Sequence, residues 1–175
     1  MSDSSSNTNT FVKLAITPDT GLDFTLDAME ATEELGRPFT ITLDVSSDKP
    51  KGDLHAILGS SATVTLTYPK KADRYFNGIV SRINYRGLTG GGYRYRLELR
   101  PWIWLLSQVQ DCKIFQNLAV WDIITGVFRD AGFTDFADRR QNQAGSTMLT
   151  FCVQYRESSL DFVTRPKRRW IGAPE

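Results

Sequence analysis

The stretch YRYRLELRPWIWLL, residues 93–106, holds the two patterns that decide the fold. From Tyr93 to Arg100, tyrosines and leucines alternate with charged residues, which is the period of two of a β-strand with one buried face. At Pro101 the alternation stops, and the apolar run over residues 102–106 predicts a short buried helix with the proline in its first turn. The chain therefore changes from strands to helices at this proline.

The same alternation recurs upstream, between Phe11 and Arg100, where Thr, Val, Ile and Tyr are abundant. The triplet at 90–92, three consecutive glycines, predicts a hairpin turn, because glycine accepts the positive φ values that such turns need. About six closely spaced strands predict an antiparallel β-barrel over residues 11–100, and the count leaves open whether the barrel is complete. The apolar faces of its strands are Leu22, Phe24 and Leu26; Phe39, Ile41, Leu43 and Val45; Ala62, Val64, Leu66 and Tyr68; and Ile79, Ile83 and Tyr85 around Ser81.

Downstream of the proline the strongest pattern is a stripe of apolar residues at helical spacing, ending at Gly132 as a C-cap. A polar loop is expected over 135–147, one more strand over 149–155, and a short helix that Ser158 and Asp161 begin as a capping box and Pro166 ends. The fold class is therefore α+β: an antiparallel β-barrel followed by a small helix-strand-helix part over 101–165. The stripe consists of Val120, Ile123, Ile124, Val127, Phe128 and Ala131.

Charge and composition exclude several classes of protein. Of 175 residues 41% are hydrophobic, and 21 Lys and Arg stand against 20 Asp and Glu, so no global field would draw the chain to nucleic acid or a membrane. We expect a disordered polar tail over 1–10 and an atypical basic tail over 166–175. The first ten residues lack the basic and apolar regions of a Sec signal, and no apolar run reaches membrane-spanning length. We therefore expect synthesis and folding in the cytoplasm.

The sequence holds no arrangement typical of an active site. His55 is the only imidazole, and we expect it to be exposed in a loop or short helix. The paired carboxylates Glu33 and Glu34 are expected in a solvated turn. Cys112 and Cys152 match no metal-binding spacing, so we expect both to be small buried fillers. We predict no catalytic residues, no metal site and no cofactor.

One binding function is an alternative. Arg94, Arg96 and Arg100 alternate along one strand, with Arg82, Arg86 and Trp102 nearby, as in a small β-barrel that binds single-stranded nucleic acid. The same residues also fit the solvated face of a half-buried strand, and Glu98 interrupts the row. We favour the solvated face, so we do not expect nucleic acid as a partner.

Five blocks follow one another along the chain: ELGRPF at 34–39, RYFNGIV at 74–80, the stretch 93–106, KIFQ at 113–116 with DII at 122–124, and FCVQYRES at 151–158 followed by DFV at 161–163. In order and spacing they resemble the signature of the VgrG proteins, which form the spike tip of bacterial type VI secretion systems. The similarity covers about residues 11–165.

The resemblance implies a structural role and a fold like the hub of contractile phage tails. In the family, three chains form a base that caps a hexameric tube of Hcp protein, and each chain supplies two similar barrels. A later needle carries a PAAR protein, and effectors travel with the assembly. For this chain it implies a homotrimer with Hcp and baseplate components as partners, and PAAR and effectors only through regions beyond these residues. It further implies assembly in the bacterial cytoplasm, export through the type VI apparatus, no membrane partner and no enzymatic activity.

The sequence departs from the family pattern after Arg165, where the family continues as RLxExEGI and this chain reads PKRRWIGAPE. We therefore hypothesise a truncated or frameshifted product that lacks the second barrel and the needle, with a genuine short paralogue as the alternative. Missing strands would leave an unpaired edge, so weak solubility or self-association is expected. Three residues of the first predicted helix, Trp102, Trp104 and Leu105, are candidates for the core or for an inter-chain contact, and we favour the core.

Overall fold

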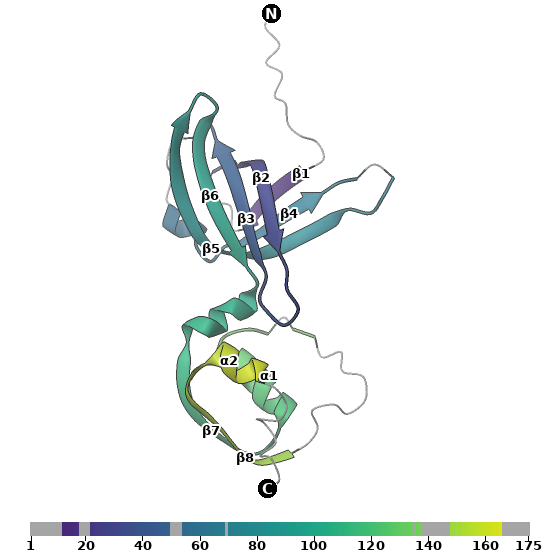
Figure 1. Ribbon diagram of the computed structural model, residues 1–175, viewed down its shortest axis with the longest axis vertical. Coiled ribbons are helices and arrows are strands. Elements are labelled where there is room, and N and C mark those ends of the chain that lie inside the picture. The colour runs from purple at the N-terminus through teal and green to yellow at the C-terminus, as the bar shows by residue number, and fades with distance from the viewer. Residues whose placement is uncertain are drawn as a thin grey trace, which may run out of the picture. The chain divides into compact units, whose positions relative to one another are not determined.

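The computed structural model describes residues 12–17, 22–49, 54–68, 70–134, 136–137 and 148–165. These residues fall into two compact units, Met1–Trp102 and Ile103–Glu175. The first unit is formed by strands and the second by a pair of strands with helices (Figure 1). The predicted tails, 1–10 and 166–175, lie outside the described residues.

A six-stranded antiparallel sheet makes up the first unit, in the spatial order β1-β4-β5-β6-β3-β2. The sheet curls into a half-barrel, and within the described residues no backbone ladder joins its edge strands β1 and β2 (Figure 1). The predicted antiparallel barrel is thus confirmed, in its open form. The strands are β1 (Val12–Thr17), β2 (Thr25–Thr32), β3 (Thr40–Ser47), β4 (Ser61–Leu66), β5 (Arg74–Thr89) and β6 (Gly92–Arg100), and the 3-10 helix η1 (Leu54–Ile57) precedes β4.

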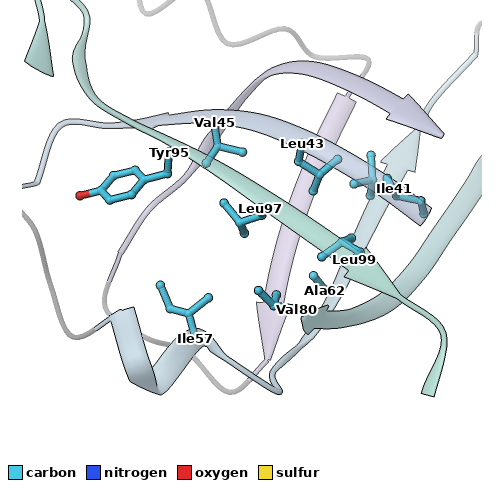
Figure 2. Packing of buried hydrophobic residues seen from close by; sticks show 10 residues of the cluster. Ile41, Leu43, Val45, Ile57, Ala62, Val80, Tyr95, Leu97 and Leu99 are labelled. Atoms are coloured by element: carbon cyan, nitrogen blue, oxygen red, sulfur yellow. The ribbon is translucent and has the colours of Figure 1, made fainter. Parts of the chain in front are cut away.

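The core of this unit lies on one face of the sheet, where alternate residues of each strand meet (Figure 2). In β3 and β6 the alternation is complete, because Leu43 and Leu97 are fully buried while their neighbours in sequence are not. Tyr95 packs edge-on against Phe24, with ring centroids 5.5 Å apart. Burial raises the pKa of the Tyr95 hydroxyl, which has no hydrogen-bond partner within the described residues. The core consists of Ile41, Leu43, Val45, Ile57, Ala62, Val64, Val80, Tyr95, Leu97 and Leu99.

β5 is the strand that bends the sheet, because it changes partner along its length. Its first part pairs with β4 and its second part with β6, and Ile79 belongs to both ladders. At the crossing, Gly78 lets the two backbones approach, since a Cβ built there would lie 2.9 Å from the carbonyl oxygen of Arg100. A glycine is required at this position for a steric reason.

A β-bulge at Ser81 corrects one prediction about β5. The extra residue reverses which side chains face inward, so Val80 is 1% exposed and Ile79 is only partly buried. The expected apolar face of Ile79, Ile83 and Tyr85 is therefore wrong for Ile79, and Tyr85 is 43% exposed. Tyr68, expected on the face of β4, lies past the end of that strand and is also exposed.

The glycine triplet forms the predicted hairpin between β5 and β6. Thr89 pairs with Gly92, which leaves Gly90 and Gly91 as a two-residue turn. Gly92 has a φ of 105°, and a Cβ there would lie 2.7 Å from the carbonyl oxygen of Ser47. The triplet therefore serves the turn and the contact with β3.

The second unit contains one strand more than predicted. Its elements are the 3-10 helix η2 (Trp102–Gln108), β7 (Gln110–Ala119), α1 (Val120–Asp130), β8 (Met148–Ser158) and α2 (Ser159–Thr164). β7 and β8 pair as an antiparallel ribbon. β7 could not be predicted from an alternation of apolar and polar residues. Its inner face carries Lys113 and its outer face carries Ile114, so each face mixes polar and apolar side chains.

The two helices predicted downstream of residue 119 are present as α-helices. α1 ends in a Schellman motif, with the amide of Gly132 donating to Arg129 and that of Phe133 to Phe128, each at 2.9 Å. The C-cap itself is Ala131, and Gly132, the predicted cap, follows it with a φ of 85°. At the start of α2 the Ser158 hydroxyl accepts the Asp161 amide at 3.0 Å, which confirms the predicted N-cap.

The lack of space beside its Cα sets the effect of replacing Gly78. We expect Gly78→Ala to lower the free energy of unfolding by about 1–3 kcal/mol, because the new methyl group collides with backbone. Urea unfolding monitored by circular dichroism measures the change. Gly90→Ala, where a Cβ meets nothing within 4 Å, is the matched control and should unfold close to the parent. Equal stability of the two variants would contradict this account of the β5 crossing.

Candidate interaction surfaces

The three residues predicted for the core or an inter-chain contact lie on η2. Trp102 and Trp104 are partly buried, Leu105 is 36% exposed, and the adjacent Leu106 is 1% exposed. η2 is a 3-10 helix, so its side chains repeat about every three residues. The assignment of these residues to core or contact stays a prediction.

The residues considered as catalytic candidates lie on different elements of the first unit. His55 is exposed in the short helix η1, as expected, and Glu33 and Glu34 are exposed in the β2–β3 connection. In the described part of the chain, no group of three His, Cys, Asp or Glu residues is placed to hold a metal ion. No helix among the described residues has the length and apolar character to cross a membrane.

The two cysteines lie on opposite faces of the β7–β8 ribbon. Cys152 is buried, and burial raises the pKa of its thiol. Cys112 is exposed, so its expected role as a buried filler is wrong. The reason is that it pairs with exposed Tyr155 on the outer face.

Ion pairs occupy much of the arginine row on β6. Arg96 makes two hydrogen bonds of 2.7 Å to the carboxylate of Asp44 on β3, and Arg100 contacts Glu98 at 2.7 Å. The Arg96 guanidinium holds the pKa of Asp44 below its usual range, and Arg86 and Arg94 lower it further through their charge. Two of the three arginines in the row thus already face a carboxylate, which disfavours a groove for nucleic-acid phosphates.

An exposed apolar surface lies on the outer face of the ribbon. Ile114 is 64% exposed, Phe151 56% and Tyr155 64%, and the residues of this face pair across the two strands. The buried side chains of Cys152 and Gln154 on β8 lie on the other face. We call Ile114, Phe151, Val153 and Tyr155 the ribbon face. Sequence reasoning missed it because β7 was not predicted.

Comparison with known protein families identifies the family of this chain. A family model described as phage tail baseplate hub (GPD) matches residues 32–170. Since the match covers most of the sequence, the chain belongs to the phage tail baseplate hub family. The match continues five residues past Arg165, where the departure from the VgrG pattern was predicted.

Relatives in this family include spike proteins of type VI secretion systems. VgrG1c and VgrG1b of Pseudomonas aeruginosa are 45% and 44% identical to the chain over 140 residues. The matched region is 80% of this chain and 19% of each relative, so the chain spans about a fifth of the length of the curated relatives it matches. The predicted resemblance to the VgrG family is confirmed, and that family is one of structural hub and spike proteins.

Solved structures show the same fold. The E. coli c3393 protein, described as a type VI secretion component similar to T4 bacteriophage tail proteins gp27 and gp5, superposes with a TM-score of 0.71 at 21% identity. The match covers 87% of this chain and 42% of that one. A chain of the Francisella PdpA–VgrG complex gives a TM-score of 0.56 at 11% identity over 87% of this chain and 26% of its own. The predicted hub-like fold is confirmed.

The pair between Asp44 and Arg96 should contribute to stability in a pH-dependent way. Because the folded-state pKa of Asp44 lies below its ordinary value of 3.8, the contribution is present above that pH and is lost as the pH falls through the lowered pKa. Both side chains are about two-fifths exposed, so we expect Asp44→Asn to lower Tm at neutral pH by at most about 4 °C.

Thermal unfolding of the parent and Asp44→Asn at neutral and strongly acidic pH measures this difference. The two Tm values should converge in acid, where Asp44 is protonated in the parent. Asp73→Asn, at an exposed carboxylate with no ion pair within the described residues, controls for the loss of charge. A Tm difference that does not depend on pH would rule out the ion pair as its cause.

Proposed function

We propose that this chain is a hub segment of a type VI secretion spike, which self-associates as a homotrimer and caps the tube of Hcp protein. The observation that carries the proposal is an open, curled half-barrel in a chain of the baseplate hub family. The role is one of assembly, and the proposal assigns no reaction to the chain.

The open edges of the half-barrel support self-association. β1 and β2 each pair on one side only within the described residues, so no ladder there uses the backbone amides and carbonyls of their outer edges, although the two strands approach each other. Unpaired strand edges offer hydrogen bonds to another chain. Further strands, from a neighbouring chain or from the remainder of a longer protein, would satisfy them.

The ribbon face supports a second contact. Isolated exposed apolar residues are common, but Ile114, Phe151 and Tyr155 are each more than half exposed and lie on one face of paired strands. Contiguous apolar patches of this kind mark protein interaction sites. We propose that the ribbon face is covered in the assembled hub.

The proposed organisation follows the two compact units, with a hub barrel up to residue 100 and a helix-containing part over 101–165. The division of the fold after Trp102 supports it. Within this scheme, the partly buried Trp102 and Trp104 belong to the core, and Leu105 is the residue of η2 that a neighbouring chain would contact.

The proposal covers assembly in the bacterial cytoplasm and export through the type VI apparatus, as the VgrG relatives suggest. Baseplate components would contact the hub. The PAAR protein and effectors belong to later segments of the family pattern and are not assigned to these residues. Truncation or a frameshift stays a hypothesis, tested by whether another reading frame of the locus encodes a RLxExEGI-like continuation.

Sedimentation velocity of the purified chain, with and without Hcp, tests the proposal. We expect concentration-dependent association of the chain with itself and co-sedimentation with Hcp. The double variant Ile114→Ser/Phe151→Ser should weaken self-association by about tenfold or more while leaving the far-UV spectrum unchanged, because it removes two exposed apolar contacts.

A matched control replaces exposed apolar residues elsewhere, in Leu88→Ser/Tyr75→Ser on β5. This variant should associate like the parent. A monodisperse monomer at all concentrations, with no affinity for Hcp, would overturn the hub proposal. Association that both double variants weaken equally would overturn the role of the ribbon face alone.

A further inference from the structure

A polar pocket lies on the first unit, on the face of the sheet opposite the core. Its volume is about 390 Å³, at the low end of the range for ligand pockets. It extends from β5 across β6 and β3 to β2, which is three strand spacings or roughly 14 Å. Charged side chains from all four strands line it: Asp27, Asp44, Arg86, Arg94 and Arg96.

Two β-bulges shape this pocket from opposite sides. In β2 the register shifts between Leu26 and Ala28, so Asp27 has no partner across the ladder. In β5 the register shifts between Tyr85 and Gly87, so Arg86 has none. A bulge re-aims the side chain of its extra residue, and both extra residues here line the same pocket although their strands are not neighbours.

The charges of the pocket are only partly neutralised within the chain. Arg96 is held by Asp44, whereas Arg94, within the described residues, donates only to the Thr89 hydroxyl, at 3.2 Å. Arg94 pairs across the ladder with Gly87, which has no side chain to cover it. Neither Arg94 nor Arg86 makes an ion pair within the described residues. The β5–β6 side of the pocket therefore presents two guanidinium groups that form no ion pair within the described residues.

A negatively charged group that could complement these guanidinium groups lies in the turn between β2 and β3. The turn joining β2 and β3, residues 33–37, places Leu35 in full exposure beside two glutamates. Glu34 is occupied within the turn, where its carboxylate meets Arg37 at 3.3 Å and its carbonyl accepts the Arg37 amide. Gly36, with a φ of 77°, completes the turn. Glu33 has no ion pair within the described residues and remains available.

The turn cannot reach the pocket of its own chain. β2 and β3 stay paired up to Thr32 and Thr40, and the pocket residues Ala28 and Asp44 lie four positions, roughly 13 Å, back along the strands. The turn points onward from the strand ends. Contact between the two features therefore requires two chains, arranged head to tail.

We propose that the β2–β3 turn of one copy of this chain docks in the bulge-flanked pocket of a second copy. The carboxylate of Glu33 would meet Arg86 and Arg94, and Leu35 would cover Ala28, which lines the pocket. Such a contact joins two different surfaces, so it builds a ring where the rotation closes and a filament where it does not. This inference rests on the self-association in the proposed function and adds the surfaces that carry part of it.

Charge reversal tests the contact. Glu33→Arg and Arg94→Glu should each weaken self-association in sedimentation velocity by about tenfold or more, because like charges would then face each other in a partly desolvated site. The double variant Glu33→Arg/Arg94→Glu should regain association, since its turn and pocket are again opposite in charge. Asp73→Arg makes the same charge change on a different exposed turn and should associate like the parent.

Cross-linking between copies supplies a direct readout that does not depend on affinity. In a Cys112→Ser background, a Leu35→Cys chain mixed with an Ala28→Cys chain should be joined by a short bis-maleimide. Leu35→Cys mixed with Tyr75→Cys, which is exposed at the far end of β5, should give much less product.

The outcomes separate this contact from the proposed function. Self-association and Hcp binding that persist through both charge reversals, with equal cross-linking to Ala28→Cys and Tyr75→Cys, would overturn the turn-in-pocket contact and leave the hub proposal standing. A parent chain that is monomeric and does not bind Hcp would overturn both. Loss of association in the single variants without recovery in the double variant would also overturn the contact.

Discussion

The close approach of β5 and β6 at Gly78 is the constraint on which the half-barrel depends. β5 is long enough to belong to two ladders, and it can leave β4 for β6 only if its backbone passes close to Arg100. A flat sheet would not need this contact. Alternation along each strand puts apolar side chains on the inner face and charged ones on the outer face, and the curvature that β5 introduces brings the inner side chains together as one core.

Cross-strand pairing organises the polar surface in the same way that packing organises the core. Asp44 and Arg96 are direct partners in the β3–β6 register, so their ion pair follows from backbone pairing. At this regular position the register matches two opposite charges within the chain. Where it is broken, at Asp27 and at Arg86, the charged side chain forms no ion pair within the described residues, and Asp27 accepts only the Ser46 hydroxyl, at 3.1 Å. Local irregularities of the sheet thus contribute charges that remain for other molecules.

Much of the fold could be predicted from the sequence because its strands separate polar from apolar residues by parity. Residues 39–45 and 93–100 show this clearly, and α1 shows the equivalent helical stripe. The alternation gave the wrong inward residue next to Ser81, where a bulge places Val80 in the core and leaves Ile79 outside it. It also missed β7, where Lys113 lies on the inner face and Ile114 on the outer face. The pocket could not be predicted, because it depends on two register shifts in strands far apart along the chain. The ribbon face could not be predicted either, because it requires the pairing of β8 with β7.

The placement of the two cysteines has a practical consequence. Cys112 is an exposed thiol on the same side of the β7–β8 ribbon as Tyr155, and Cys152 is shielded on the opposite side. An environment-sensitive fluorophore attached through a maleimide would therefore label one position of the unaltered protein. Its emission would change when another surface excludes water from that position. The unaltered sequence therefore already provides the attachment site for a fluorescent reporter of assembly.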